Sequence, residues 1–207
     1  PHTYTAGGYS QATTLAYFWE AMSDAWASNP DTMAQVPIYD LPLTHYFTNL
    51  SGQQQSNGPI HPADKTPVGQ RMAAAALGLV YDGDDAYTAP VYKSMEIVDG
   101  KIRITFDQVG SGLEVKDGAP TLHGFAIAGE DGVYVDANAT IVSADTVEVW
   151  NDRVAEPKNV TYAFSSFNMA ANLQNSAGIA AAPFRTSRDT ADGSLYLPHD
   201  WQYADGE

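Results

Sequence analysis

One histidine of this sequence stands in a setting that suits acid–base chemistry. His61 lies in the run Pro59-Ile60-His61-Pro62. Each proline fixes its own φ angle and pushes the residue before it towards extended geometry, so we expect a stiff loop. An imidazole exchanges protons near neutral pH, which is what a general base requires. The run therefore indicates a candidate catalytic base, with a solvent-facing loop histidine as the alternative.

A helix is expected directly after this loop. Asp64 or Thr66 can cap its first turn, and Pro67 suits the first helical position. Residues 70–81 are rich in alanine and leucine, which favour helix. Arg71 is expected to hold this helix by pairing with a nearby carboxylate.

The first third of the chain alternates between helical and extended patterns. Apolar residues recur at spacings of three and four over residues 12–28, which predicts a helix with one buried face. Residues 36–43 form an apolar run with two prolines, which we interpret as a short buried strand. A polar loop is expected over residues 48–58. This alternation is typical of α/β layer folds, so residues 1–83 are expected to be the carboxy-terminal part of an α/β domain.

The pattern changes after a turn at residues 82–85. Residues 101–106 alternate strictly between polar and apolar, and further short runs follow between Gly and Asp turns. Such spacing predicts an antiparallel all-β sandwich over residues 88–186. The polar residues 187–207 are expected to form a tail. The predicted fold class is therefore α/β followed by an all-β sandwich.

The composition argues against several kinds of partner. The 207 residues carry 25 acidic and 10 basic side chains, a formal net charge of −15. Nucleic acids and anionic membranes require a basic surface, so neither is an expected partner. The chain has no cysteine, which removes disulfides and thiolate metal ligands. The acids within residues 82–85 lack the spacing of a calcium loop, so we expect no metal and no cofactor.

An ordered set of short segments is specific as a set, although each segment alone is weak. The segments are residues 18–26, 36–39, 60–65, 68–72, 109–113, 124–129 and 183–186. With these segments in this order, the chain resembles the sialate O-acetylesterase family, which are carbohydrate esterases with an SGNH-hydrolase-type catalytic domain. The resemblance covers residues from about Leu15 to Thr186.

The resemblance implies a serine-type carbohydrate acetylesterase. In this family, the equivalent of His61 activates a serine for attack on an acetyl ester, an acyl-enzyme forms, and water releases acetate. The implied substrate is an O-acetylated sugar or glycan. An exported or cell-surface location also follows only from the resemblance and the acidic charge.

Parts of the family's machinery have no counterpart in this sequence. The family's nucleophile lies in a Gly-Gln-Ser-Asn segment near the start of the catalytic domain, and Ser10 is only a weak lookalike. We therefore expect an upstream amino-terminal segment of the same protein to supply the serine and the oxyanion donors, and this chain alone to be inactive.

The acid of the catalytic triad is also unassigned by the sequence. Family members carry an aspartate shortly before the histidine, whereas residues 56–60 contain no acid. Asp40 and Asp64 are the candidates to orient His61, and a dispensable acid is the alternative. Two other interpretations stay open: a non-catalytic glycan-binding or structural sandwich module, and a degenerate, inactive homologue.

Overall fold

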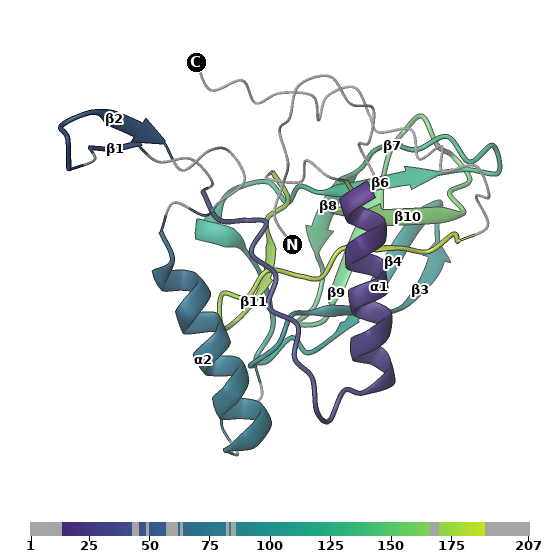
Figure 1. The fold of residues 1–207 in the computed structure, drawn as a ribbon. Coiled ribbons are helices and arrows are strands. Elements are labelled where there is room, and N and C mark those ends of the chain that lie inside the picture. Colours follow the sequence, from purple (N-terminus) through teal and green to yellow (C-terminus); the bar gives the residue numbers. More distant parts are fainter. Residues whose placement is uncertain are drawn as a thin grey trace.

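Two helices stand beside a body of antiparallel sheets (Figure 1). The computed structural model describes residues 14–42, 46–48, 50–56, 62, 64–81, 83, 86–165 and 170–188. Its elements are α1 (Thr14–Ser28), β1 (Tyr46–Thr48), β2 (Gln54–Ser56), α2 (Thr66–Val80), β3 (Val91–Val98), β4 (Lys101–Asp107), β5 (Leu113–Val115), the 3-10 turn η1 (Lys116–Gly118), β6 (Phe125–Ala128), β7 (Val135–Asp136), β8 (Asn138–Ile141), β9 (Thr146–Trp150), β10 (Asn159–Tyr162), β11 (Leu173–Asn175) and β12 (Phe184–Arg185).

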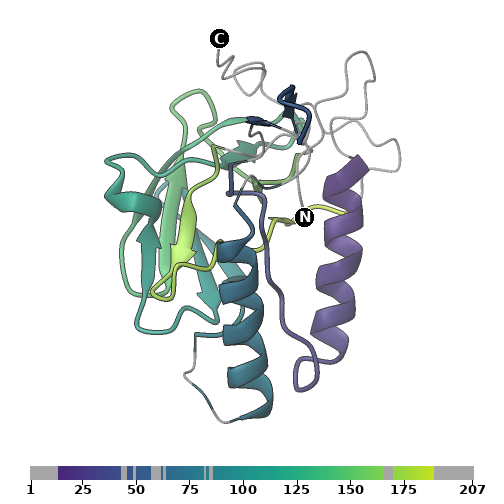
Figure 2. The ribbon, with the colours of Figure 1, turned by 60° about the vertical axis from the view of Figure 1, so that its left-hand side comes forward.

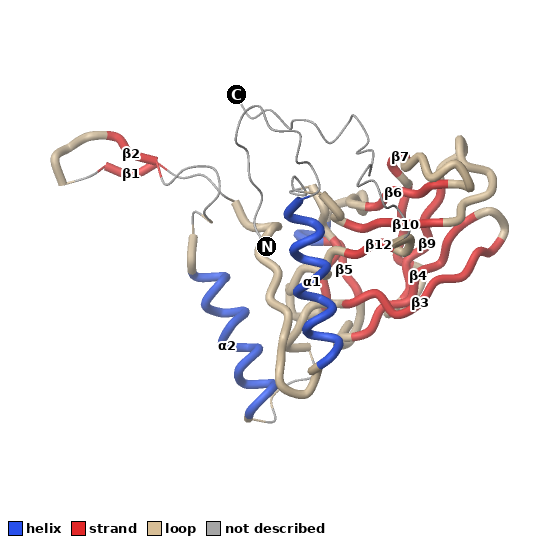
Figure 3. Tube along the Cα trace, turned by 45° about the vertical axis from the view of Figure 1, so that its right-hand side comes forward, coloured by secondary structure: helices blue, strands red, loops and turns tan. Residues whose placement is uncertain are grey.

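Strands β3 to β12 gather in one region, which we call the sheet body (Figure 3). It contains two four-stranded antiparallel sheets, in the orders β3-β4-β9-β8 and β12-β10-β6-β7, and the pair β11-β5. Buried side chains of both larger sheets belong to one apolar core. The predicted mostly antiparallel, sheet-rich region is therefore confirmed.

Strand β4 shows why the alternation of polar and apolar residues predicted a strand correctly. Its alternate residues Ile102, Ile104 and Phe106 are buried, while the residues between them are partly exposed. On the neighbouring strand, Val149 lies opposite Ile102 and Val147 lies opposite Ile104. Side chains of a strand point alternately to its two faces, so this register places one apolar face against the core.

The prediction of a strand over residues 36–43 is wrong for the described residues 36–42, which form an irregular segment with a turn. Pro37 and Pro42 have no N–H to donate to a ladder. The segment is apolar because it packs against the sheet body: Tyr39 is fully buried and its hydroxyl donates to the Ala181 carbonyl oxygen at 2.7 Å.

The polar loop expected over residues 48–58 is also different in part. It contains a short antiparallel hairpin, in which Thr48 of β1 pairs with Gln54 of β2. Its polar sequence shows no period of two, so the pattern did not indicate strands. The predicted division at residues 82–85 stays a prediction, although Tyr39, which precedes it, contributes to the core of the sheet body.

Helix α1 matches the helix predicted from the apolar spacing. Ala16 and Trp19 are buried with Phe164 of the sheet body, and Trp19 stacks on Tyr39 with ring centroids 6.3 Å apart. The outward side of α1 carries Phe18, which is 62% exposed. Neither described helix is long and apolar enough to cross a lipid bilayer.

Helix α2 begins as predicted and is apolar on nearly all sides. The Asp64 carboxylate accepts a hydrogen bond from the Thr66 N–H at 2.8 Å, and Pro67 lies in the first turn. Within the helix, only Ala75 is buried, and it is 8% exposed. Figures 1 and 2 show residues 29–42 running between the two helices, both of which stand on the same side of the sheet body.

Two glycines of α2 are expected to respond oppositely to alanine. A Cβ at Gly78 would lie 2.1 Å from a ring carbon of Tyr87, whereas a Cβ at Gly69 would have no described atom within 4 Å. We expect Gly78→Ala to lower the free energy of unfolding by about 1–3 kcal/mol through overpacking. Gly69→Ala should raise it by roughly 0.5–1 kcal/mol, because alanine favours helix. Urea unfolding measures both, and equal effects would contradict the contact between α2 and Tyr87.

Candidate functional site

The loop before α2 carries the predicted base, and the structure describes only its end. His61 and Ser10 lie outside the described residues. Pro62 is buried, and the Lys65 amine donates to its carbonyl oxygen. The residue after His61 is therefore fixed to the start of α2.

A buried cluster of charges holds α2 against the rest of the chain. The Arg71 guanidinium donates to both oxygens of Asp40, at 2.7 and 2.8 Å. The Lys116 amine donates to Oδ2 of Asp40 at 2.9 Å. The Asp40 side chain is only 2% exposed. The predicted pairing of Arg71 with a carboxylate is confirmed, and we call Asp40, Arg71 and Lys116 the Asp40 cluster.

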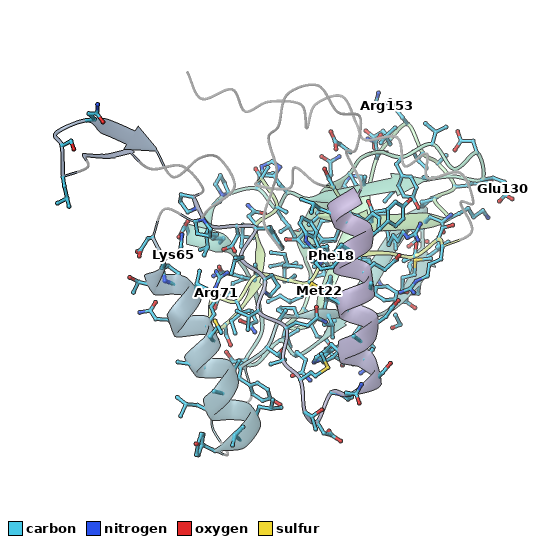
Figure 4. All side chains as sticks on the ribbon, viewed as in Figure 1. Phe18, Met22, Lys65, Arg71, Glu130 and Arg153 are labelled. Carbon is cyan, nitrogen blue, oxygen red and sulfur yellow. The ribbon has the colours of Figure 1, made fainter. Side chains whose placement is uncertain are left out.

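The Asp40 cluster joins three separate parts of the chain. Arg71 comes from α2, Asp40 from the segment between the helices, and Lys116 from the 3-10 turn of the sheet body. Arg71 also donates to the carbonyl oxygens of Pro37, at 2.7 Å, and Gly178, at 3.0 Å. Figure 4 labels Arg71 on α2 and Lys65 just before the start of this helix. One guanidinium thus fixes the helix that follows the His61 loop.

The Asp40 carboxyl group stays ionised although it is buried. Burial raises its pKa, but hydrogen bonds and charge from Arg71 and then Lys116 lower it more, and the net pKa lies below the ordinary value. With both cations, the cluster carries a net charge of about +1, since one carboxylate faces two cations. Both Asp40 oxygens accept hydrogen bonds from these positively charged groups.

A depressed carboxyl pKa predicts a specific loss of stability in acid. The stabilisation is present above the unfolded pKa of about 3.9 and disappears as the pH falls through the lower folded pKa. We expect the free energy of unfolding of the wild type to fall steeply below about pH 4, and that of Asp40→Ala to fall less over the same range. Urea unfolding at neutral pH and through the acid range measures this, and parallel curves would contradict it.

Asp64 accepts a hydrogen bond at the start of α2 in the described structure. It is exposed, and the hydrogen bond from the Thr66 N–H lowers its pKa. Asp64 lies one residue before the N-cap residue Lys65, whose own side chain makes no capping hydrogen bond, and Asp64 binds the N–H of the first helical residue instead. That Asp64 or Asp40 orients His61 stays a prediction.

Among the described residues, no group of three or more His, Asp or Glu side chains is arranged to hold a metal ion. His123 is exposed, and its backbone N–H donates to the Asn172 side chain at 2.8 Å.

A second charged cluster was not found from the sequence. Glu20 of α1 accepts two hydrogen bonds from Arg185 of β12, at 2.8 and 2.9 Å. The Arg185 guanidinium also lies over the rings of Tyr17 and Phe164. Glu20 and Arg185 are 165 residues apart, so no local pattern could have paired them.

The comparisons with known proteins give one informative result. No protein-family model matches the sequence, and no curated protein matches it. A solved structure of a carbohydrate acetylesterase from Xanthomonas citri is similar, with a TM-score of 0.72, 33% sequence identity and coverage of 88% of this chain. This chain covers 38% of that protein's chain. Most of this chain is therefore similar, in sequence and in fold, to part of a carbohydrate acetylesterase.

Proposed function

We propose that this chain forms the carboxy-terminal part of a carbohydrate O-acetylesterase of the SGNH-hydrolase type. The observation that carries the proposal is the similarity of 88% of the chain, at 33% identity, to a carbohydrate acetylesterase. The order of short segments that resembles the sialate O-acetylesterases also supports it. In this proposal, His61 is the general base, on a loop whose far end is fixed to α2.

The proposed reaction proceeds through an acyl-enzyme. His61 takes the proton of a serine hydroxyl while the serine oxygen attacks the acetyl carbonyl carbon. The ester bond breaks, and the sugar oxygen leaves with the proton from His61. Water then attacks the acetyl-serine with His61 again as base, which releases acetate and restores the serine. An O-acetylated sialic acid is the first substrate to test, and acetylated xylan fragments are the second.

The serine is proposed to come from an upstream amino-terminal segment of the same protein. The support comes from the outward sides of the helices, because a solvent-facing helix side is normally polar. On α2, Leu77 is 56% and Val80 66% exposed, and Met72 is exposed nearby. On α1, Phe18 and Met22 are exposed one turn apart, and Figure 4 labels both. The upstream segment would cover these apolar sides.

One observation favours the second candidate function, a non-catalytic or degenerate module. Asp40 has both oxygens bound by Arg71 and Lys116, and Asp64 accepts the Thr66 N–H at the start of α2. If neither acid turns to His61, the base must work without a carboxylate from these two positions. A catalytic histidine still retains activity without its acid in some hydrolases, at a reduced rate.

The proposal is tested by comparing this 207-residue chain with a longer protein that includes the upstream reading frame. We expect the longer protein to release acetate from acetylated sugars and the 207-residue chain to release none. Ser10→Ala in the longer protein should keep full activity. If the 207-residue chain releases acetate and Ser10→Ala abolishes this, the nucleophile is internal and the proposed upstream serine is wrong. If neither protein releases acetate from any tested sugar, the non-catalytic function replaces the esterase.

A further inference from the structure

The side of α2 that faces away from the Asp40 cluster carries no charge. Arg71 is the only charged residue of this helix, and its guanidinium binds the buried Asp40 carboxylate. Ala75, one turn further along, is buried on the same side. Residues three and four apart share one face of a helix. The opposite face, which we call the α2 outer face, is exposed and consists of Gly69, Met72, Ala73, Ala76, Leu77 and Val80.

The α2 outer face differs from a helix side that stays in water. A solvent-facing helix side is normally polar and charged. Here Met72 is 61%, Leu77 56% and Val80 66% exposed. No acidic or basic residue interrupts them, although the chain carries 25 acidic and 10 basic side chains. Exposed apolar residues that gather on one face, rather than lying singly, mark an interaction surface.

The charges of the chain argue against a lipid surface as the occupant of this face. Helices that lie on membranes carry Lys or Arg on their polar side, which α2 lacks apart from the engaged Arg71. The net charge of −15 also opposes binding to anionic lipids. The similar acetylesterase structure indicates a different occupant. This chain covers 38% of that protein's chain, so more than half of that protein has no counterpart here.

Small residues on the α2 outer face allow a close approach. A Cβ at Gly69 would have no described atom within 4 Å, and Ala73 and Ala76 continue this small-residue surface along the helix. The distance between two packed elements depends on the side chains at their contact. A neighbouring backbone can therefore come near α2 along these three residues, while the larger Met72, Leu77 and Val80 pack beside it.

We propose that the α2 outer face is the docking surface of the upstream segment, one element of which packs closely along Gly69, Ala73 and Ala76. The inference rests on the upstream segment proposed above, and it adds the surface that this segment contacts. In the longer protein, α2 is then an interior helix that is covered on both faces. The inference concerns packing alone, so it is tested without measuring acetate release.

Methionine oxidation reports whether the α2 outer face is covered. Met72 lies on this face, and Met33, which is 39% exposed in the segment between the helices, is the internal control. We would treat the 207-residue chain and the longer protein with hydrogen peroxide and map methionine sulfoxide by mass spectrometry. We expect Met72 to oxidise as fast as Met33 in the 207-residue chain. In the longer protein, it should oxidise about tenfold more slowly than Met33.

The outcomes of this experiment separate the inference from the esterase proposal. If Met72 oxidises as fast as Met33 in the longer protein, the inference is overturned, whether or not acetate is released. It is also overturned if the 207-residue chain is a dimer in sedimentation and already protects Met72, because a second copy is then the occupant. A longer protein that protects Met72 but releases no acetate supports the inference and contradicts only the esterase proposal.

Ala73→Leu tests the close approach. The 207-residue chain should keep its Tm, because Ala73 is exposed and leucine also favours helix. The longer protein should lose about 3 °C in Tm, because the added atoms overpack the contact. As the matched control, Ala155→Leu enlarges an exposed alanine of the sheet body and should leave both Tm values unchanged. An unchanged Tm of Ala73→Leu in the longer protein would overturn the close packing.

Discussion

Replacing Asp40 by alanine is expected to lower the free energy of unfolding by about 3–5 kcal/mol. The change leaves the Arg71 and Lys116 cations facing each other in a site where the Asp40 side chain is only 2% exposed. Breaking a buried ion pair by removing one partner is costly because the charge left behind stays desolvated. Arg71 would also lose its hydrogen bonds to Asp40 in the segment between the helices. Urea unfolding at neutral pH, followed by circular dichroism, measures the loss.

Two further variants test whether the loss of stability arises because the charges are buried. Asp107→Ala removes an exposed carboxylate paired with Lys93 at 2.8 Å, and should cost no more than about 1 kcal/mol. The triple change Asp40→Leu, Arg71→Met and Lys116→Met replaces the whole cluster by apolar side chains and leaves no unpaired charge, so it should be more stable than Asp40→Ala. If Asp40→Ala costs no more than Asp107→Ala, the Asp40 cluster does not hold α2 in place.

Replacing His61 by alanine is expected to reduce kcat for acetate release by about 10³-fold or more in the longer protein with the upstream reading frame. The loss should appear in kcat with little change in KM, because a general base acts in the transition state rather than in substrate binding. Initial rates of acetate release across substrate concentrations measure both constants.

His123 provides the matched control for this prediction. It is exposed, and its backbone N–H donates to the Asn172 side chain. His123→Ala should therefore leave kcat unchanged. If His61→Ala and His123→Ala have the same small effect, His61 is not the base and the resemblance in this loop does not extend to function.

The sequence predicted the elements whose apolar residues have a clear period. The spacing of three and four over residues 12–28 corresponds to α1, and the alternation over residues 101–106 corresponds to β4. Residues 36–43 lack such a period. An apolar run indicates that the residues are buried. It does not say whether they form a strand or an irregular segment, because both can pack against a core. The two cases differ only in the folded chain, where Tyr39 packs into the core of the sheet body.

The sequence predicted that Arg71 pairs with a carboxylate, but it did not predict which residues form the cluster. Arg71 was expected to pair with a carboxylate, and Asp40 was singled out for a different role. Lys116, the third member, lies 76 residues after Asp40, and no local pattern joins them. A pocket beneath α1 is likewise built from Trp26, Tyr92 and Phe184, which meet only in the folded chain.

The most direct test of the proposed acyl-enzyme mechanism is the location of the acetyl group during turnover. We would mix the longer protein with an O-acetylated sugar, quench it within one turnover, and map the acetylated peptide by mass spectrometry. We expect acetyl-serine on a residue outside these 207 residues, and a loss of that signal in His61→Ala. An acetyl group on Ser10, or acetate release with no acetylated serine in any peptide, would contradict it.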